Sequence, residues 1–300
     1  MPSSPSSADF EGLVVSGHGR HVVVETADGS RVLCHARGKK SECVVGDRVL
    51  WQRSGDEGVI EALLPRRNLL YRQDAWKTRA FAANLDQLLI VVAAEPVFSE
   101  SQLARALIAA RAAGIPARIV LNKHDLPSWP AAEARLSPYV AMGVDVIGVA
   151  LKKEPAPAHA LLTPQLEGRA TLVLGPSGAG KSTLVNLLVK DAKVQVGEIS
   201  ESLNTGRHTT TATHWYWIDT SRRSALIDSP GFQEFGLRHI AANELASLMP
   251  DLAARVGECR FYNCSHLHEP GCGVLAALAR GEISESRYRI YGEIRAELPA

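Results

Sequence analysis

The chain has 300 residues, of which 46% are hydrophobic and 22% are charged, and its formal net charge is +1. This composition is typical of a globular protein of about two domains. A charge so close to zero excludes binding of nucleic acid through overall charge, so such binding would need local basic patches. No apolar run is long enough to span a membrane, and residues 1–9 are predicted to be a disordered tail rather than a signal peptide. Five cysteines without a secretion signal indicate a reducing, cytoplasmic location.

Residues 10–66 are predicted to form a small β-barrel of the OB-fold type. Five short strands in so short a segment, separated by turn signals such as Asp28-Gly29 and Gly55-Asp56, are typical of that fold. The barrel either binds an oligonucleotide or makes only protein contacts, and the basic run Arg37-Gly38-Lys39-Lys40 favours RNA. The predicted strands span residues 13–15, 21–26, 31–35, 47–52 and 59–64.

Residues 66–84 are predicted to be a basic linker that contains a single acid, Asp74. Such a segment either follows a phosphate backbone and stacks on bases or packs against the neighbouring domain. Its basic residues are Arg66, Arg67, Arg72, Lys77 and Arg79, and the aromatic residues Tyr71 and Trp76 lie among them.

An alternation of strands and helices begins at residue 85 and predicts a parallel sheet. The apolar strand at 170–174 precedes a G-x-x-x-x-G-K-S match and then helix-forming sequence, which is the context of a phosphate-binding loop. Backbone N–H groups would bind the phosphates, Lys181 would reach the terminal ones, and the Ser182 hydroxyl would ligate Mg²⁺. The predicted phosphate-binding residues are Gly175, Pro176, Ser177, Gly178, Ala179, Gly180, Lys181, Ser182 and Thr183.

A guanine-binding motif is predicted at Asn122-Lys123-His124-Asp125, directly after a strand at 118–121. The Asp125 carboxylate can accept from the N1–H and N2–H₂ edge of guanine, which adenine lacks, while Asn122 would hold neighbouring loops. A strand at 145–149 should carry the remaining guanine-contact loop, where Ala150-Leu151 replaces the Ser-Ala pair general in GTPases. Because this contact is largely through backbone N–H, the change need not abolish guanine binding.

The order of these motifs is reversed relative to ordinary GTPases, because N-K-x-D precedes the phosphate loop by about fifty residues. A parallel sheet brings its strand ends together whatever the chain order, so both motifs can still bind one nucleotide. The sequence therefore predicts a circularly permuted GTPase domain.

The residues expected to sense the γ-phosphate follow the phosphate loop. The run Gly206-Arg207-His208-Thr209-Thr210-Thr211 is typical of a switch segment, in which Thr210 would supply a hydroxyl to Mg²⁺. A strand at 224–227 is followed by Asp228-Ser229-Pro230-Gly231. Asp228 is at the position of the acid that holds Mg²⁺, and Gly231 is at the position of the residue that senses the γ-phosphate.

Phe232 occupies the position at which many GTPases carry a water-orienting glutamine. Intrinsic hydrolysis should therefore be slow, unless another group orients the water. His208 is the first candidate for that group and Gln233 a weaker one. The predicted catalytic residues are thus Lys181, Thr210 and His208.

The last segment predicts a structural zinc site formed by Cys259, Cys264, His266 and Cys272, although His268 could replace His266 on spacing. A Cys₃His set leaves no open position for catalysis, so the metal would hold together a module too small to fold on its own core. The helices expected around this site span residues 242–249, 273–280 and 284–297.

Together these residues resemble the small ribosomal subunit biogenesis GTPase RsgA family, a family of bacterial permuted GTPases. The resemblance implies an N-terminal OB-fold, a central permuted GTPase and a C-terminal zinc domain. It further implies docking on the small ribosomal subunit and its rRNA, and GTP hydrolysis that the subunit stimulates and that is coupled to release. It is carried by the motifs Ala82-Ala83-Asn84-Leu85-Asp86-Gln87, Val120-Leu121-Asn122-Lys123, the phosphate loop, Gly206–Thr211, Cys259–Cys272 with Glu269-Pro270-Gly271, and Gly281–Tyr288.

The leading hypothesis is a monomeric GTPase that uses GTP, Mg²⁺ and one structural Zn²⁺, and that binds neither DNA nor membrane. The predicted parts are a tail at 1–9, the barrel at 10–66, the permuted GTPase domain at 67–236 and the zinc-binding helical domain at 237–300. One alternative is an RNA-binding assembly scaffold that senses GTP and GDP with negligible turnover, which Phe232 motivates. A P-loop ATPase is the other alternative, which Asn122 and Asp125 disfavour.

Overall fold

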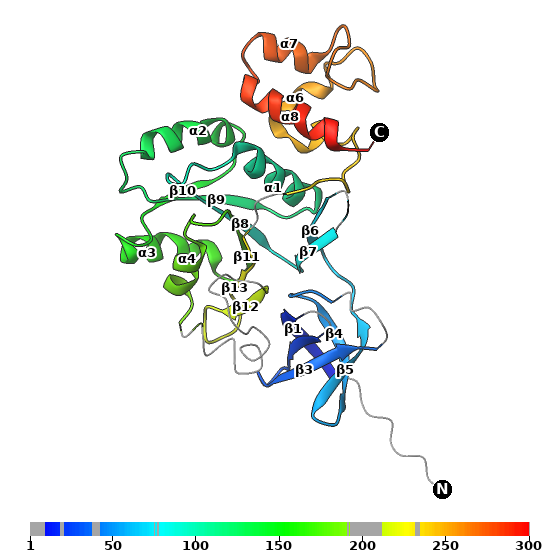
Figure 1. The fold of residues 1–300 in the computed structure, drawn as a ribbon, viewed down its shortest axis with the longest axis vertical. Coiled ribbons are helices and arrows are strands. Elements are labelled where there is room, and N and C mark those ends of the chain that lie inside the picture. Colours follow the sequence, from blue (N-terminus) through cyan, green and yellow to red (C-terminus); the bar gives the residue numbers. More distant parts are fainter. Residues whose placement is uncertain are drawn as a thin grey trace.

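The computed structural model describes residues 10–18, 21–37, 43–74, 76, 78–190, 192, 212–231 and 235–299. A five-stranded barrel, an α/β domain and a helical C-terminal module follow one another along the long axis of the molecule (Figure 1). The strand order β10-β9-β8-β11-β13-β12-β1-β2-β3-β5-β4 runs from the α/β domain into the barrel, so the two share one sheet.

The barrel confirms the predicted OB-fold. Its strands pair in the order β1-β2-β3-β5-β4, and β4 pairs back with β1 to close the barrel. Alternate residues such as Val22, Val24 and Trp51 point inward and form a separate small core. The strands are β1 Phe10–His18, β2 His21–Glu25, β3 Arg31–Ala36, β4 Arg48–Ser54 and β5 Glu57–Leu63.

The segment predicted to be a linker is instead an antiparallel hairpin of β6 (Leu69–Gln73) and β7 (Thr78–Ala83). The prediction was wrong because charged side chains interrupt the apolar alternation, although Leu70 and Phe81 are buried under the neighbouring domain. The backbone of Gln73 bonds with Gly236 and Arg238, which ties the hairpin to the chain that follows β13.

The α/β domain contains a parallel sheet of β10, β9, β8, β11 and β13, with β12 antiparallel at its edge. Helices α1 and α2 cover one face and α3 and α4 the other (Figure 1). Its strands are β8 Gln87–Ala93, β9 Ala117–Asn122, β10 Val146–Val149, β11 Ala170–Leu174, β12 His214–Trp217 and β13 Ala225–Asp228. The helices are α1 Glu100–Ala112, α2 Trp129–Ala141, α3 Pro155–Leu166 and α4 Lys181–Leu188.

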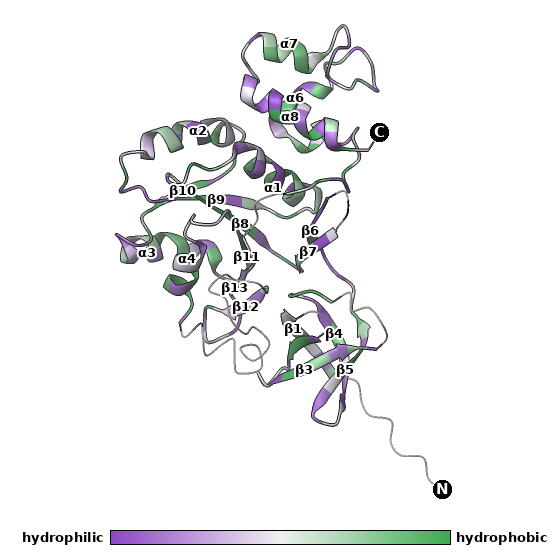
Figure 2. Cartoon of the chain, viewed as in Figure 1, coloured by the Kyte–Doolittle hydropathy of each residue, from purple (hydrophilic) through white to green (hydrophobic). Residues whose placement is uncertain are grey.

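The central strands are buried on both faces, as a parallel sheet requires. Successive residues of β8 alternate between the two cores: Leu88 and Ile90 pack under α1, whereas Leu89 and Val91 pack under α4. Hydrophobic colouring accordingly concentrates on these strands (Figure 2). Their continuous apolar sequences are therefore what made them predictable.

The C-terminal module is helical, as predicted, but its first helix is displaced. The predicted helix at 242–249 is a turn with one 3₁₀ segment, and the following α-helix starts at Pro250. The residue before a proline is disfavoured in the helical region, and Met249 is indeed extended, with φ −107° and ψ 107°. The elements are η1 Ala246–Leu248, α6 Pro250–Val256, α7 Gly273–Ala279 and α8 Glu285–Glu297.

Among the described residues, no helix combines the length and the apolar character needed to cross a membrane.

Candidate functional site

The candidate nucleotide site lies at the carboxyl edge of the parallel sheet. The strand order reverses between β8 and β11, because chain order runs β8, β9, β10 on one side and β11 then β13 on the other. Ligands of open α/β sheets bind in the crevice at such a reversal. The phosphate loop follows β11, the guanine motif follows β9, and Asp228 ends β13. The structure therefore brings the two predicted motifs to one edge despite their reversed order.

The phosphate loop has glycine at two positions of positive φ where backbone or a buried side chain approaches closely. Gly175 has φ +154°, and a Cβ there would lie 2.1 Å from the Val91 carbonyl oxygen. Gly180, at the N-cap of α4, has φ +109°, and a Cβ there would lie 2.3 Å from Asn122 Nδ2. These contacts hold the loop against β8 and β9, so the first turn of α4 faces the sheet edge.

Lys181 begins α4, and its side chain folds back over the loop. Its Nζ donates to the backbone carbonyls of Gly175 and Pro176, each at 2.8 Å. Burial lowers the pKa of Lys181, while the nearby Asp228 carboxylate acts in the opposite direction. A phosphate oxygen is a stronger partner than a neutral carbonyl because it is charged, so Lys181 is placed to exchange these carbonyls for phosphates.

The acidic side of the site is built by the end of β13. Asp228 is 6% exposed and pairs in register with His214 of β12, while Ser229 Oγ donates to the Val173 carbonyl at 3.0 Å. A Cβ on Gly231 would lie 3.0 Å from Lys181 Nζ. Asp228, Gly231 and Lys181 are thus neighbours, and the exposed Ser182 and Thr183 follow Lys181 on α4.

Asn122 connects three loops of the site. Its Nδ2 donates to the Ala179 carbonyl of the phosphate loop at 2.9 Å. Its Oδ1 accepts from the backbone N–H of Lys123 at 2.8 Å and of Leu151 at 3.1 Å. Asn122 is buried, so each of these bonds replaces one that water could otherwise make. The amide therefore fixes the guanine motif, the phosphate loop and the loop after β10 relative to one another.

The same contacts explain how Ala150-Leu151 can stand in place of a Ser-Ala pair. The loop uses its backbone at Leu151 to reach Asn122, and the Val149 carbonyl accepts from the N–H of His124. Neither bond depends on a serine side chain. Beside them, Lys123 has φ +69° and donates through Nζ to the Glu95 carbonyl, and the Asp125 side chain is exposed.

The sequence did not reveal Glu95, which supports the guanine motif from the loop after β8. Its carbonyl accepts from Lys123, and its Oε1 accepts from Ser128 Oγ at 2.7 Å. Glu95 belongs to no motif, so no sequence signal marked it. The predicted residues Gly206–Thr211, with His208 and Thr210, lie outside the described residues, as do Phe232, Gln233 and the basic residues Lys39 and Lys40.

A second candidate site is the predicted Cys₃His cluster of the C-terminal module. One ligand atom each from Cys259, Cys264, His266 and Cys272 lies within 4.8 Å of the others, and His268 is not among them. The Sγ atoms of Cys259 and Cys272 are 3.9 Å apart. Ligands about 2.3 Å from a tetrahedral zinc lie about 3.8 Å from one another, so the spacing and the donor set fit zinc.

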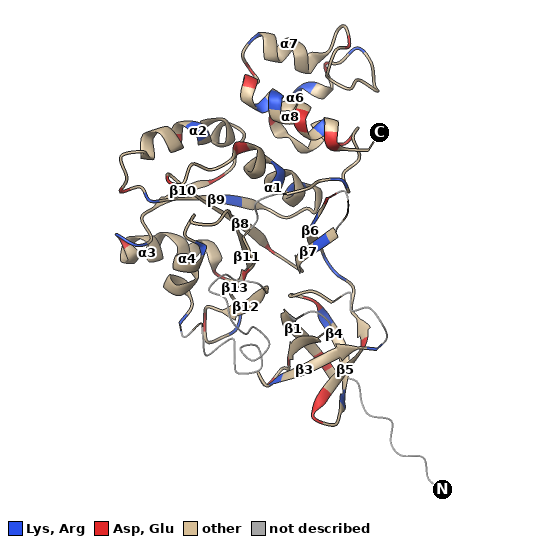
Figure 3. Cartoon of the chain, in the orientation of Figure 1, with Lys and Arg blue, Asp and Glu red and all other residues tan. Residues whose placement is uncertain are grey.

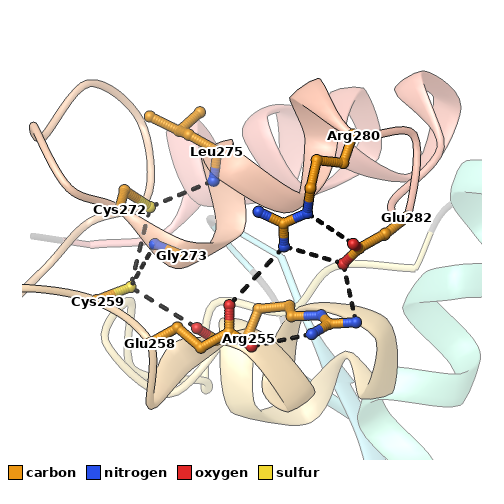
Figure 4. Close-up of polar contacts among 8 residues, drawn as sticks. All are labelled: Arg255, Glu258, Cys259, Cys272, Gly273, Leu275, Arg280 and Glu282. Atoms are coloured by element: carbon orange, nitrogen blue, oxygen red, sulfur yellow. Dashed lines mark hydrogen bonds and ion pairs between the residues drawn. The ribbon is translucent and has the colours of Figure 1, made fainter.

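Backbone and ionic contacts support this cluster (Figure 4). The N–H of Gly273 donates to Cys259 Sγ at 3.3 Å, and that of Leu275 donates to Cys272 Sγ at 3.5 Å, so the cluster also caps α7. Such N–H···S contacts stabilise the thiolate form that a metal needs. An alternating ring of ion pairs lies beside it, formed by Arg255, Glu258, Arg280 and Glu282.

Glu269 shapes the loop that carries the metal ligands. It accepts hydrogen bonds from the backbone N–H groups of Ser265, Leu267 and His268 at 2.7–3.2 Å. Hydrogen bonds from Ser265 and the neighbouring backbone hold the pKa of Glu269 well below its usual range. The carboxylate therefore stays ionised and keeps the turn around His266, whose φ is +60°, in place.

A parallel sheet with a phosphate loop at its reversal point, joined through Asn122 to a guanine motif that precedes it in the chain, defines a circularly permuted GTP-binding protein. The family model described as RsgA GTPase matches residues 63–238. The chain belongs to this RsgA GTPase family and is a GTPase, a hydrolase that acts on GTP.

Similar proteins match along almost their whole length. A Variovorax paradoxus protein named small ribosomal subunit biogenesis GTPase RsgA is 59% identical over 293 residues, which is 96% of this chain and 92% of the relative. A Burkholderia pseudomallei protein of the same name is 52% identical, over 98% and 95% of the two chains.

Solved structures agree in fold. YjeQ from Thermotoga maritima aligns with a TM-score of 0.72 and 29% identity over 97% of this chain and 98% of its own. YloQ, described as a circularly permuted GTPase, aligns with a TM-score of 0.69 and 26% identity over 99% and 97%. The likeness thus includes the barrel and the C-terminal module as well as the GTPase domain.

Proposed function

We propose that this GTPase binds the small ribosomal subunit late in its maturation, and that the subunit stimulates hydrolysis, which is coupled to release. The observation that carries the proposal is the 59% identity, over 96% of the chain, to a relative named for small ribosomal subunit biogenesis. The protein would act in the cytoplasm as a monomer and contact rRNA rather than DNA or membrane.

In this proposal the nucleotide occupies the carboxyl edge of the sheet. Mg²⁺, when bound, would neutralise charge on the β- and γ-phosphates, held by Ser182, Asp228 and a switch threonine, Thr210. Lys181 would contact the terminal phosphates through the ammonium that now bonds to loop carbonyls. The exposed Asp125 would accept from guanine, on a loop that Asn122 and Lys123 hold in place.

The catalytic water needs a positioning group other than glutamine, because Phe232 stands at that position. We assign the role to His208, on the switch segment. The γ-phosphate would govern the conformation of residues 200–211 and 228–236 and so report the nucleotide state to the subunit.

Exposed aromatic and basic side chains support rRNA contact at two places. On the β6–β7 hairpin, Trp76 is 97% exposed, and Arg79 on the basic part of β7 is exposed as well (Figure 3). The second place is the zinc loop, the segment from Cys259 to Cys272. There Tyr262 is fully exposed and Arg260 lies 5.5 Å from the Phe261 ring centre. Aromatic faces beside cations are what unpaired bases stack on.

The Cys₃His cluster would bind one structural zinc in this proposal. Its four ligands leave no open position, so the ion would stabilise the module and take no part in hydrolysis. Zinc would thereby fix the loop that carries Tyr262.

The proposal is tested by GTP turnover of the purified protein alone, with small subunits and with large subunits, with ATP as the nucleotide control. We expect slow turnover alone and strong stimulation by the small subunit only. Slow turnover that no subunit changes would instead favour a scaffold that senses the nucleotide. Equal use of ATP would contradict the assigned role of Asp125.

Lys181→Ala is the matched test of the phosphate site. Removal of a charged hydrogen bond to phosphate should weaken GTP binding about tenfold to a hundredfold, measured by titration with a fluorescent nucleotide. Lys190→Ala, an exposed lysine beyond α4, is the control and should bind as the parent does. Unchanged GTP affinity in Lys181→Ala would contradict the whole assignment.

A further inference from the structure

The β12–β13 hairpin carries part of the nucleotide site, yet it belongs equally to the joint with the barrel. It begins immediately after the predicted switch segment and ends at Asp228. Its strands are in continuous antiparallel register from His214 opposite Asp228 to Trp217 opposite Ala225. A paired hairpin moves as a unit, so a contact that fixes its outer strand also fixes Asp228.

The barrel contacts this outer strand directly. Ser16 of β1 pairs with His214 of β12, and Ser16 Oγ lies 3.0 Å from His214 Nδ1. Both side chains are buried. His214 pairs with Ser16 of the barrel on one side and with Asp228 on the other. It is therefore the single residue between the barrel and Asp228, the candidate Mg²⁺ ligand.

Glu25 makes a second connection at the same joint. This barrel residue ends β2 and is 5% exposed. Its carboxylate bonds both to the barrel and to the β12–β13 hairpin. Its Oε1 accepts from Trp217 Nε1 at 2.7 Å and lies 3.8 Å from Arg222 Nη1. Its Oε2 accepts from Arg31 Nε at 3.0 Å, which anchors the carboxylate within the barrel.

The turn of the barrel at Gly29 is shaped to receive Arg222. Gly29 has φ +88°, and a Cβ there would lie 2.0 Å from Arg222 Nη2, so the guanidinium rests on the bare backbone. Arg222 itself has φ +53°, in the turn that connects β12 to β13. An open pocket of about 300 Å³ lies at this joint and is lined in part by Glu25, Trp217 and Arg222.

We infer that Glu25 is a positioning residue for the nucleotide site: it fixes the β12–β13 hairpin to the barrel, so that the barrel's engagement with the subunit and the nucleotide state are coupled. The inference rests on the proposed function, which supplies the subunit as the barrel's partner. Glu25 acts through Trp217 and Arg222 and contacts no nucleotide. Coupling of this kind is reciprocal, so the bound nucleotide must alter subunit affinity by the same factor as the subunit alters nucleotide affinity.

The test measures the affinity of the full-length protein for small subunits twice, with a non-hydrolysable GTP analogue and with GDP. The ratio of the two affinities is the coupling. Glu25→Gln keeps the shape but weakens both ionic contacts, and Trp217→Phe keeps the ring but removes the N–H donor. Glu61→Gln is the control, because it also neutralises a barrel carboxylate, one whose ion pair is with Arg37, at 3.1 Å, within the barrel.

We expect Glu25→Gln and Trp217→Phe each to reduce the ratio about fivefold or more, the range of ordinary coupling energies. Glu61→Gln should leave the ratio unchanged. A ratio equal to that of the parent in both joint variants overturns the inference, even if the variants are less stable. A parent ratio of one would instead contradict the proposed function, so the two failures are distinguishable.

Discussion

The barrel meets the GTPase domain through a shared sheet, whereas the C-terminal module meets it through side chains that project from helices. At the barrel, β1 pairs with β12, and Glu25 connects both sides. At the module, Arg105 of α1 makes a bidentate ion pair with Glu297 of α8, with N–O distances of 2.6 and 2.7 Å. Arg287 of α8 bonds to Asp251 and lies 5.2 Å from the centre of the Tyr139 ring of α2.

This difference determines how each neighbour can respond to nucleotide. The barrel reaches β12 through the pair Ser16–His214, and the β12–β13 ladder carries a displacement on to β13 because its strands are paired along their whole length. A joint of helix side chains can shift by small rotations while its ion pairs persist. The barrel is therefore the better placed of the two to sense the nucleotide site through Asp228. Each of the following experiments separates the two joints.

Removal of the metal should have the largest effect, confined to the module. Structural zinc contributes about 10–16 kcal/mol in small zinc domains, so Cys272→Ser or chelation should unfold α7 and the zinc loop. Hydrogen exchange would then show lost protection from Cys259 to Ala279, with nucleotide binding and barrel protection retained. Cys43→Ser, a cysteine of the barrel outside the cluster, is the control. Loss of barrel protection on chelation would contradict the expectation that the effect is confined to the module.

Arg287→Met should be the next most damaging change. The side chain is 4% exposed, and its removal leaves the nearly buried Asp251 carboxylate without its bidentate partner. Breaking such a buried pair costs about 3–5 kcal/mol, measurable by urea unfolding at fixed zinc and nucleotide concentration. Arg289→Met is the matched control on the same helix, since Arg289 is 72% exposed and its ion pair is worth about 0.5 kcal/mol or less. Equal effects of the two would show that Asp251 does not need Arg287.

The parts of the structure that the sequence predicted are those whose determinants are local. Strand 170–174 and the loop that begins at Gly175 lie where the apolar run and the glycine spacing indicated. The Cys₃His cluster is equally local, since one turn and Glu269 bring its ligands together. The guanine motif needed one further step, that parallel strands end at a common edge.

The features that the sequence did not reveal depend on partners distant in the chain. Strand β12 went unpredicted, because its aromatic residues are explained only by β13 and by Glu25, which is remote in sequence. The β6–β7 hairpin is held by backbone hydrogen bonds between Gln73 and the segment around Gly236. Helix α3 also went unpredicted, because it begins at Pro155 and contains Pro157, and prolines are tolerated in the first turn of a helix.

The smallest effect is expected within the barrel, for Arg66→Met. Arg66 binds both oxygens of Asp47, whose side chain is fully buried, at 2.7 and 2.8 Å. Asp47 also accepts from the backbone N–H of Val44 at 2.7 Å, so the carboxylate keeps a partner after the substitution. We therefore expect the free energy of unfolding to fall by about 2 kcal/mol, which is less than for Arg287→Met. Urea unfolding, with hydrogen exchange of the barrel amides as the readout, would measure this. A greater loss than for Arg287→Met would contradict this order, and would mean that the bond from the Val44 N–H does not compensate the buried Asp47 carboxylate for the lost guanidinium.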